Sequence, residues 1–271
     1  MNANKTMIGI LLVCIALFSA INSNAQDRLF TYTYQSSVLN KGQRELESWN
    51  TLRAGREDYY ARFDNRTEYE IGLGKNLQTS FYLNLTSISS TSIDNSSKSV
   101  STEHEIGFSN EWKLKLLDPV ANSFGAALYG EVGIFSNEVE LEGKVILDKK
   151  IGNLTIAANG VYEQEFAPGY INNELKWQNE KKAEAYLAFA YSLNPKFNLT
   201  LENAYKNVFV ESELTNSALF TGLGFSYVQD KFWVNFTAMP QLTSLKGEST
   251  NNLNLNEYEK IQIRLLFSFM L

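Results

Sequence analysis

The sequence is poor in the residues that build disulfide scaffolds and transition-metal sites: it has one cysteine, one histidine and four prolines in 271 residues. Cys14 lies within an apolar N-terminal run, so we expect a mature chain without cysteine, which excludes a small disulfide-stapled fold. A single histidine, His104, leaves almost nothing for a zinc site, and no cysteine remains to act as a nucleophile. The sequence therefore predicts no catalytic residue, metal or cofactor.

Long hydrophobic runs are also missing after residue 25, where nothing approaches the ~18 consecutive apolar residues of a transmembrane helix. Before it, Lys5, an apolar run over Met7–Ile21 and the small-residue end Ser23-Asn24-Ala25 predict a secretory signal peptide over residues 1–25. A membrane protein without helices has to be a closed β-barrel. The formal net charge of −6 and the absence of a Lys/Arg block argue against nucleic acid as a partner.

What the sequence does contain is alternation, and Tyr60–Gly74 shows it best. Apolar side chains occupy one face of this predicted strand, among them Phe63, Ile71 and Leu73. The opposite face carries five charges: Arg62, Asp64, Arg66, Glu68 and Glu70. A charge facing lipid costs ~2–4 kcal/mol at the bilayer midplane, so we expect these five side chains to point into a wet lumen.

Similar segments recur along the chain, and the links between them alternate in length. We count about twelve strands of ~9–14 residues, the length that a tilted membrane strand needs. Short links lie at Gly74–Asn76, Lys149–Gly152, Asn194–Lys196 and Gln229–Lys231, and long ones at Ile88–Ser101, Phe166–Lys181, Asn207–Ser217 and Leu242–Asn256. Short periplasmic turns and long external loops are typical of outer-membrane barrels.

These observations predict an all-β fold: a transmembrane antiparallel up-and-down β-barrel of about 12 strands over residues 42–271, with both ends in the periplasm. Residues 26–41 precede the barrel as a periplasmic lead or as an N-terminal plug, and their alternating aromatic residues do not decide between the two.

The last strand, KIQIRLLFSFML, places apolar side chains at alternate positions from Ile261 to Leu271. With this strand, the signal ending NAQD and the polar loops, the chain resembles bacterial outer-membrane β-barrel proteins of the Bacteroidota type. The resemblance implies a Gram-negative outer membrane, contact with outer-membrane lipid, and recognition of the C-terminal strand by the barrel-assembly machinery.

Charged side chains on the predicted lumen face are sorted by sign. The basic set lies on the first, second and last strands, which barrel closure makes neighbours, and consists of Arg53, Arg62, Arg66 and Lys260. The acidic set lies on the other wall and consists of Glu103, Glu105, Glu138, Glu140, Glu163 and Glu184. Two interpretations stay open: a transverse field across a selective pore, or neighbouring charges that pair and fill a closed barrel.

We therefore expect a narrow pore or transporter for small solutes, a porin-like barrel with a charged lumen, although no solute can be named. The alternative is a closed structural or surface-interaction barrel without transport. A lipid-acting outer-membrane enzyme is disfavoured, because twelve-stranded outer-membrane phospholipases carry a serine two residues after the histidine of their triad, and here Ile106 takes that position after His104.

Overall fold

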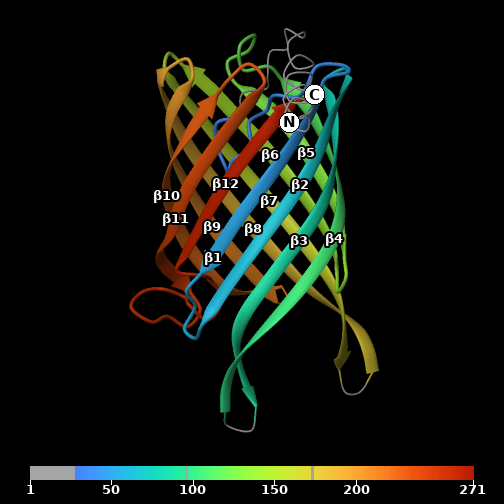
Figure 1. The fold of residues 1–271 in the computed structure, drawn as a ribbon, viewed down its shortest axis with the longest axis vertical. Helices are drawn as coiled ribbons and strands as arrows, with labels where there is room; N and C mark the ends of the chain where they lie inside the picture. Colours follow the sequence, from blue (N-terminus) through green and yellow to red (C-terminus); the bar gives the residue numbers. More distant parts are fainter. Residues whose placement is uncertain (1–27, 95–96, 172–173, 211) are drawn as a thin grey trace, which may run out of the picture.

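The computed structural model describes residues 28–94, 97–171, 174–210 and 212–271 (Figure 1). The predicted signal peptide lies outside these residues. Within them, no helix is long and apolar enough to cross a membrane.

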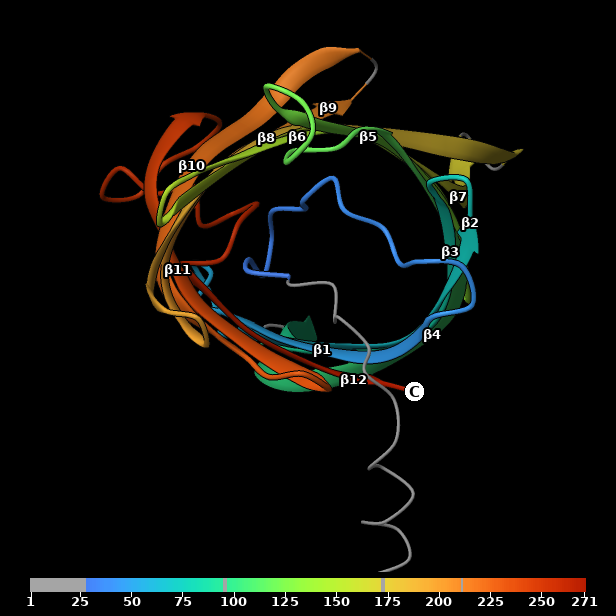
Figure 2. The same ribbon diagram turned by 90° about the horizontal axis from the view of Figure 1, so that it is seen from above.

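The described residues form twelve antiparallel strands in one closed barrel, so the predicted fold is confirmed (Figures 1 and 2). Each strand is hydrogen-bonded to its sequence neighbours, and β1 closes the barrel by pairing with β12 over Glu45–Ala54 and Ile261–Met270. The strands are β1 (Arg44–Ala54), β2 (Tyr60–Gly74), β3 (Leu77–Asp94), β4 (Ser97–Leu117), β5 (Gly125–Phe135), β6 (Val139–Ile151), β7 (Leu154–Ile171), β8 (Glu174–Asn194), β9 (Phe197–Val210), β10 (Glu213–Val228), β11 (Phe232–Lys246) and β12 (Ile261–Met270).

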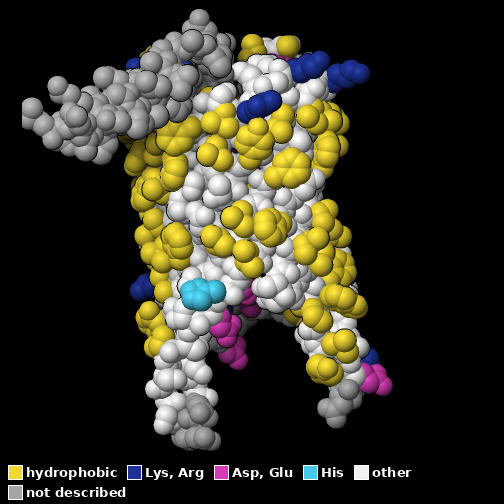
Figure 3. Space-filling model, turned by 45° about the vertical axis from the view of Figure 1, so that its right-hand side comes forward, with side chains coloured by type: hydrophobic (Ala, Val, Ile, Leu, Met, Phe, Trp, Pro, Cys, Tyr) yellow, Lys and Arg dark blue, Asp and Glu magenta, His cyan; other side chains and the backbone are white. Residues whose placement is uncertain are grey.

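The two faces of the barrel wall differ as the alternation predicts. Outward side chains are large and apolar, for example Phe63 on β2 and Leu141 on β6, which are 47% and 44% exposed in the isolated chain. Apolar side chains cover the outer wall, while acidic side chains show at the lower mouth between two projecting hairpins (Figure 3). This apolar belt around a closed barrel places the protein in the outer membrane.

The short links and both described chain ends lie at one end of the barrel, which we take as periplasmic (Figure 1). The β2–β3 turn is built from Lys75 and Asn76, both with positive φ (52° and 62°), the conformation of a two-residue type I′ hairpin. At the other end, the long links expected at Ile88–Ser101 and Phe166–Lys181 are mostly strand, because β3–β4 and β7–β8 continue as paired hairpins beyond the rest of the barrel.

Residues 28–41, the lumen segment, run inside the barrel near its periplasmic end (Figure 2). The segment has no regular secondary structure, and Phe30, Thr31 and Thr33 are at most 1% exposed. Its buried backbone therefore needs hydrogen-bond partners from the surrounding wall.

Candidate functional site

The lumen is the candidate site, and one carboxylate fixes the segment that crosses it. Glu202 on β9 is fully buried and accepts hydrogen bonds from the backbone N–H groups of Thr31, Tyr32 and Thr33, each at 2.9 Å. The Thr31 hydroxyl at 2.9 Å and the Thr237 hydroxyl at 2.8 Å complete its shell. Three consecutive amides that converge on one carboxylate hold the chain in a bend.

Further wall side chains bind the rest of the segment's backbone. Asn159 on β7 binds both the N–H and the C=O of Tyr34, at 2.6 and 3.0 Å. The other anchors accept from or donate to one backbone group each, at 2.8–3.0 Å: Asp148 on β6 from Ser36, Gln78 on β3 from Leu39, and Asn235 on β11 to Arg28. Since the anchors come from strands around the whole barrel, the segment is tied across the lumen.

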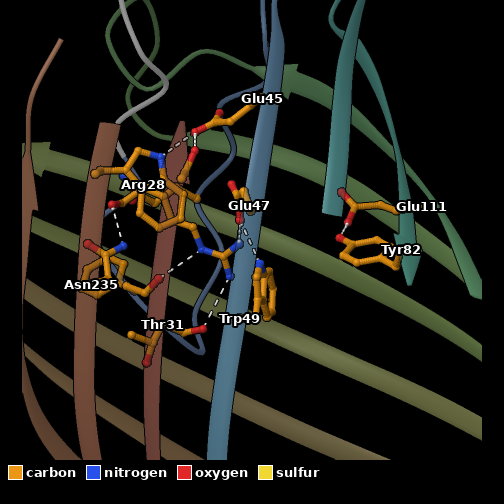
Figure 4. A network of polar contacts seen from close by, with 12 residues as sticks. Arg28, Thr31, Glu45, Glu47, Trp49, Tyr82, Glu111 and Asn235 are labelled. Atoms are coloured by element: carbon orange, nitrogen blue, oxygen red, sulfur yellow. Dashed lines mark hydrogen bonds and ion pairs between the residues drawn. The ribbon is translucent and has the colours of Figure 1, made fainter. Parts of the chain in front are cut away.

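Cations of the wall and of the lumen segment stack on aromatic rings around the segment. The Arg28 guanidinium lies 4.4 Å from the ring centroid of Tyr34. It lies 4.2 Å from that of Trp49 (Figure 4). Arg264 on β12 lies 3.9 Å from the Tyr32 centroid, and Lys144 on β6 lies 4.2 Å from that of Tyr34. Such contacts contribute about 2 kcal/mol or more where the cation is desolvated.

The lumen segment separates two cavities. The outer one, of about 440 Å³, has Tyr32 and Tyr34 of the segment in its lining. The inner one, of about 710 Å³, is lined from the segment by Leu29, Gln35 and Ser37. No described residue lines both cavities, and the segment contributes side chains to each, so it lies between them.

The outer cavity collects most of the charged residues predicted from the sequence. Those in its lining are Arg53, Arg62, Arg66, Glu105, Glu138, Glu140, Glu163 and Glu184. Glu103 and Lys260 are exposed and are not in this lining. Glu103 pairs with Ile88 in the strand register, on the part of β4 toward the projecting hairpin. At the outer rim, the backbone N–H of Lys260 donates to the carbonyl of Gly55 at 2.7 Å.

Arg264 is the lumen cation on the last strand that the sequence analysis missed. It lines the outer cavity and donates to the Thr51 hydroxyl at 2.8 Å and to the carbonyl of Thr31 at 3.3 Å. The sequence contained this signal, because the polar residues of one face of KIQIRLLFSFML are Lys260, Gln262, Arg264 and Ser268.

Most of these charges pair with near neighbours. Asp64 binds both Arg53 and Arg62, at 3.0 and 2.6 Å, and Arg66 binds Glu131 at 2.6 Å. On the opposite wall the pairs are Lys144–Glu142 at 2.7 Å, Lys182–Glu163 at 2.9 Å, Lys182–Glu165, and Lys206–Glu184 at 3.8 Å. Local pairing therefore removes much of the transverse field that the sorted charges predict.

Apart from Arg264, the charges of the described lining that have no ion-pair partner are acidic. Glu138 and Glu140 have no cation within 4.0 Å in the part of the chain that the structure describes. Twelve carboxyl groups and eight Lys and Arg side chains line the cavity, so its formal net charge is negative. Glu138 lies in the β5–β6 link, where partial burial and the nearby Glu165 raise the pKa of its carboxyl to about 7.

Nothing around His104 assembles into a catalytic arrangement. Its side chain is exposed, and in the strand register it lies opposite Ser87. Among the described residues no hydrogen bond joins His104 to a hydroxyl or a carboxylate.

Comparison with known proteins identifies the family. The model of the family of unknown function DUF6662 matches residues 22–271, so the chain belongs to this family. No curated protein matches the sequence.

Solved structures with the same fold are bacterial outer-membrane barrels. An outer membrane channel from Pseudomonas putida F1 (COG4313) superposes with a TM-score of 0.61 at 11% identity, covering 87% of this chain and 98% of that one. The translocator domain of the autotransporter NalP from Neisseria meningitidis gives 0.58 at 9% identity, covering 99% and 96%. The NanC porin gives 0.52 at 13% identity, covering 83% and 100%.

Proposed function

We propose that this member of the DUF6662 family is a narrow outer-membrane pore for small solutes, with a mild preference for cations and with the lumen segment as its constriction. The observation that carries the proposal is the outer cavity, whose carboxylates outnumber its cations and include the unpaired Glu138 and Glu140. Two of the barrels of similar fold are named as a channel and a porin, which supports a conducting role.

The geometry gives each part of the lumen a role in this proposal. The lumen-facing residues near the outer mouth set the local potential: a net negative charge in a cavity with low-dielectric walls raises the local concentration of cations. Tyr32 and Tyr34, held by Glu202 and Asn159, then set the width of the passage between the two cavities.

Conductance of the purified full chain in planar bilayers tests the proposal. We expect small unitary currents whose reversal potential, in a salt gradient, shows a cation preference. A protein that is folded, by its heat-modifiable migration on gels, and yet carries no current would overturn it.

A second candidate, a closed barrel without transport, is favoured by one observation. Side chains from seven strands, β1, β3, β6, β7, β9, β11 and β12, hold the lumen segment, which is more than a loose constriction needs. In that case the wild-type chain carries no current in planar bilayers, and removal of the lumen segment produces current. We also propose that β12 is the strand recognised by the assembly machinery, since Phe267 and Phe269 near the chain end lie on the apolar alternate positions of the strand.

A further inference from the structure

The inner half of the barrel wall buries five glutamates side by side. They are Glu45 and Glu47 on β1, Glu68 and Glu70 on β2, and Glu111 on β4, each at most 4% exposed. The register places Glu45 opposite Glu70 and Glu47 opposite Glu68. Like charges directly opposite each other destabilise a strand pair, so this arrangement requires compensation.

The cations and hydrogen bonds around the five glutamates compensate only part of the repulsion between their carboxylates. Among the described residues, Glu47 alone of the five has an ion-pair partner, Arg28 at 3.5 Å (Figure 4). Glu45 accepts from Trp233 at 2.7 Å and from Ser268, and Glu111 accepts from Tyr82. The one other cation buried on this wall in the described chain is Lys113, so the carboxylates outnumber the cations by three.

Several carboxylate oxygens have no hydrogen-bond partner among the described residues. Both oxygens of Glu68 are buried without a hydrogen bond to this part of the chain, as is one oxygen each of Glu45, Glu70 and Glu111. A buried carboxylate without a partner is costly, and an unsatisfied buried group in a native fold calls for an explanation such as a proton or an ion.

A second observation is independent of the carboxylates. The hydroxyl of Ser80 on β3 is fully buried and has no hydrogen-bond partner in the chain that the structure describes. Ser80 stands between Glu70 and Glu111 in the strand register, paired with both. A free hydroxyl oxygen at this position adds a neutral ligand to the anionic ones.

We propose that Glu68, Glu70, Glu111 and Ser80 bind a calcium ion in the inner barrel wall. One carboxylate oxygen from each of the three glutamates lies within 4.8 Å of the others. An all-oxygen ligand set with several carboxylates is the kind that Ca²⁺ prefers. The scarcity of histidine and cysteine led the sequence to predict no metal, but this site uses neither residue type as a ligand. The ion offsets the repulsion between β1, β2 and β4, and it leaves Glu47 to hold Arg28 of the lumen segment.

Two other outcomes compete with this proposal. The glutamates can be neutralised by shared protons, in which case no metal is retained. Calcium can instead bind at the outer cavity, where Glu138, Glu140 and Glu165 also bring ligand oxygens within 4.8 Å of one another. The experiment therefore has to separate binding from no binding, and the inner wall from the outer cavity.

In the described structure none of the five inner glutamates lines either cavity, so the ion is supplied while the barrel folds. The full chain is refolded into detergent micelles with Ca²⁺ or with a chelator and then desalted. Retained calcium is counted by elemental mass spectrometry, and the midpoint of thermal unfolding is followed by circular dichroism. We expect about one retained Ca²⁺ per chain and a higher midpoint after refolding with Ca²⁺, because a ligand that binds only the folded state stabilises it.

Matched variants locate the ion. We expect Glu68→Gln and Glu70→Gln to lose the retained calcium and the shift in midpoint, and Glu140→Gln in the outer cavity and Glu248→Gln in an exposed loop to keep both. Because a change at a buried carboxylate can itself impair folding, Ser80→Ala is included. It removes one neutral ligand, and we expect calcium affinity to fall about tenfold or more.

The proposal is overturned if the wild-type chain retains no calcium, if all variants retain it equally, or if Glu140→Gln is the variant that loses it. These outcomes concern calcium content and stability, not current, so they are independent of whether the barrel conducts.

Discussion

The outer and inner halves of the lumen use charge in opposite ways. In the outer half, opposite charges lie on neighbouring strands, as in the Arg53–Asp64 pair of β1 and β2, and they surround a cavity. In the inner half, like charges lie on neighbouring strands, and the lumen segment crosses the space that the wall encloses. The side chains of the wall therefore match what they face. In the outer half they face a cavity and side chains of opposite charge, and in the inner half they face backbone donors and buried cations.

The largest effect on conductance is expected from removing the lumen segment, because the difference between the two halves of the lumen depends on it. A variant without residues 28–39 loses Tyr32 and Tyr34 from between the two cavities. We expect its unitary conductance in planar bilayers to rise severalfold, with the heat-modifiable migration of the barrel retained. An unchanged conductance in a folded variant would show that the constriction lies elsewhere.

Loosening the segment without removing it is expected to act less strongly. In Glu202→Gln, an amide N–H₂ replaces one of the oxygens on which the N–H groups of Thr31, Tyr32 and Thr33 converge. Since hydrogen bonds to a charged group contribute ~1.5–3 kcal/mol, local opening of the segment becomes correspondingly more favourable.

Hydrogen exchange read by mass spectrometry measures this opening. The amides of residues 31–33 are expected to exchange faster in Glu202→Gln and to stay protected in Glu248→Gln, whose substitution lies in an exposed loop. Equal protection in both variants would mean that the remaining anchors suffice.

The contrast also separates what the sequence could predict from what it could not. The alternation in Tyr60–Gly74 places Asp64 and Arg66 inward and Phe63 outward, and the structure agrees, because the period of two is a local property of a strand. The position of the lumen segment depends on Glu202, about 170 residues away along the chain, and no local pattern carries that information.

The two lumen candidates that lie outside the cavity lining have a related explanation. Alternation gives the face of a residue but not its depth along the strand, so Glu103 near the projecting β3–β4 hairpin and Lys260 at the start of the last strand were grouped with deeper residues. Depth depends on where the bilayer ends, and the strands that extend past it keep the same alternation with both faces in water.

Within the outer half, neutralising the unpaired carboxylates is expected to shift ion selectivity. Glu138→Gln with Glu140→Gln removes two carboxyl groups that no cation within 4.0 Å compensates in the described structure. The reversal potential in a salt gradient should move toward anions, and the shift should shrink in concentrated salt, because exposed charges are screened over ~10 Å at 0.1 M. If Glu248→Gln in the external loop shifts it equally, the effect is not specific to the cavity.

The smallest effect on ion selectivity is expected from a change of pH, and it tests the role of the Glu138 carboxyl. Burial and the nearby Glu165 raise the pKa of the Glu138 carboxyl to about 7, with Lys182 opposing the shift and Glu105 and Glu163 adding to it. A carboxyl with a raised pKa is charged above that value and neutral below it. The cation preference of the wild-type pore should therefore weaken as the pH falls through about 7. In Glu138→Gln this step should disappear while the preference due to the other carboxylates remains. A step of the same size in both proteins would assign the titration to another group of the outer cavity and would leave Glu138 without influence on the permeating ion.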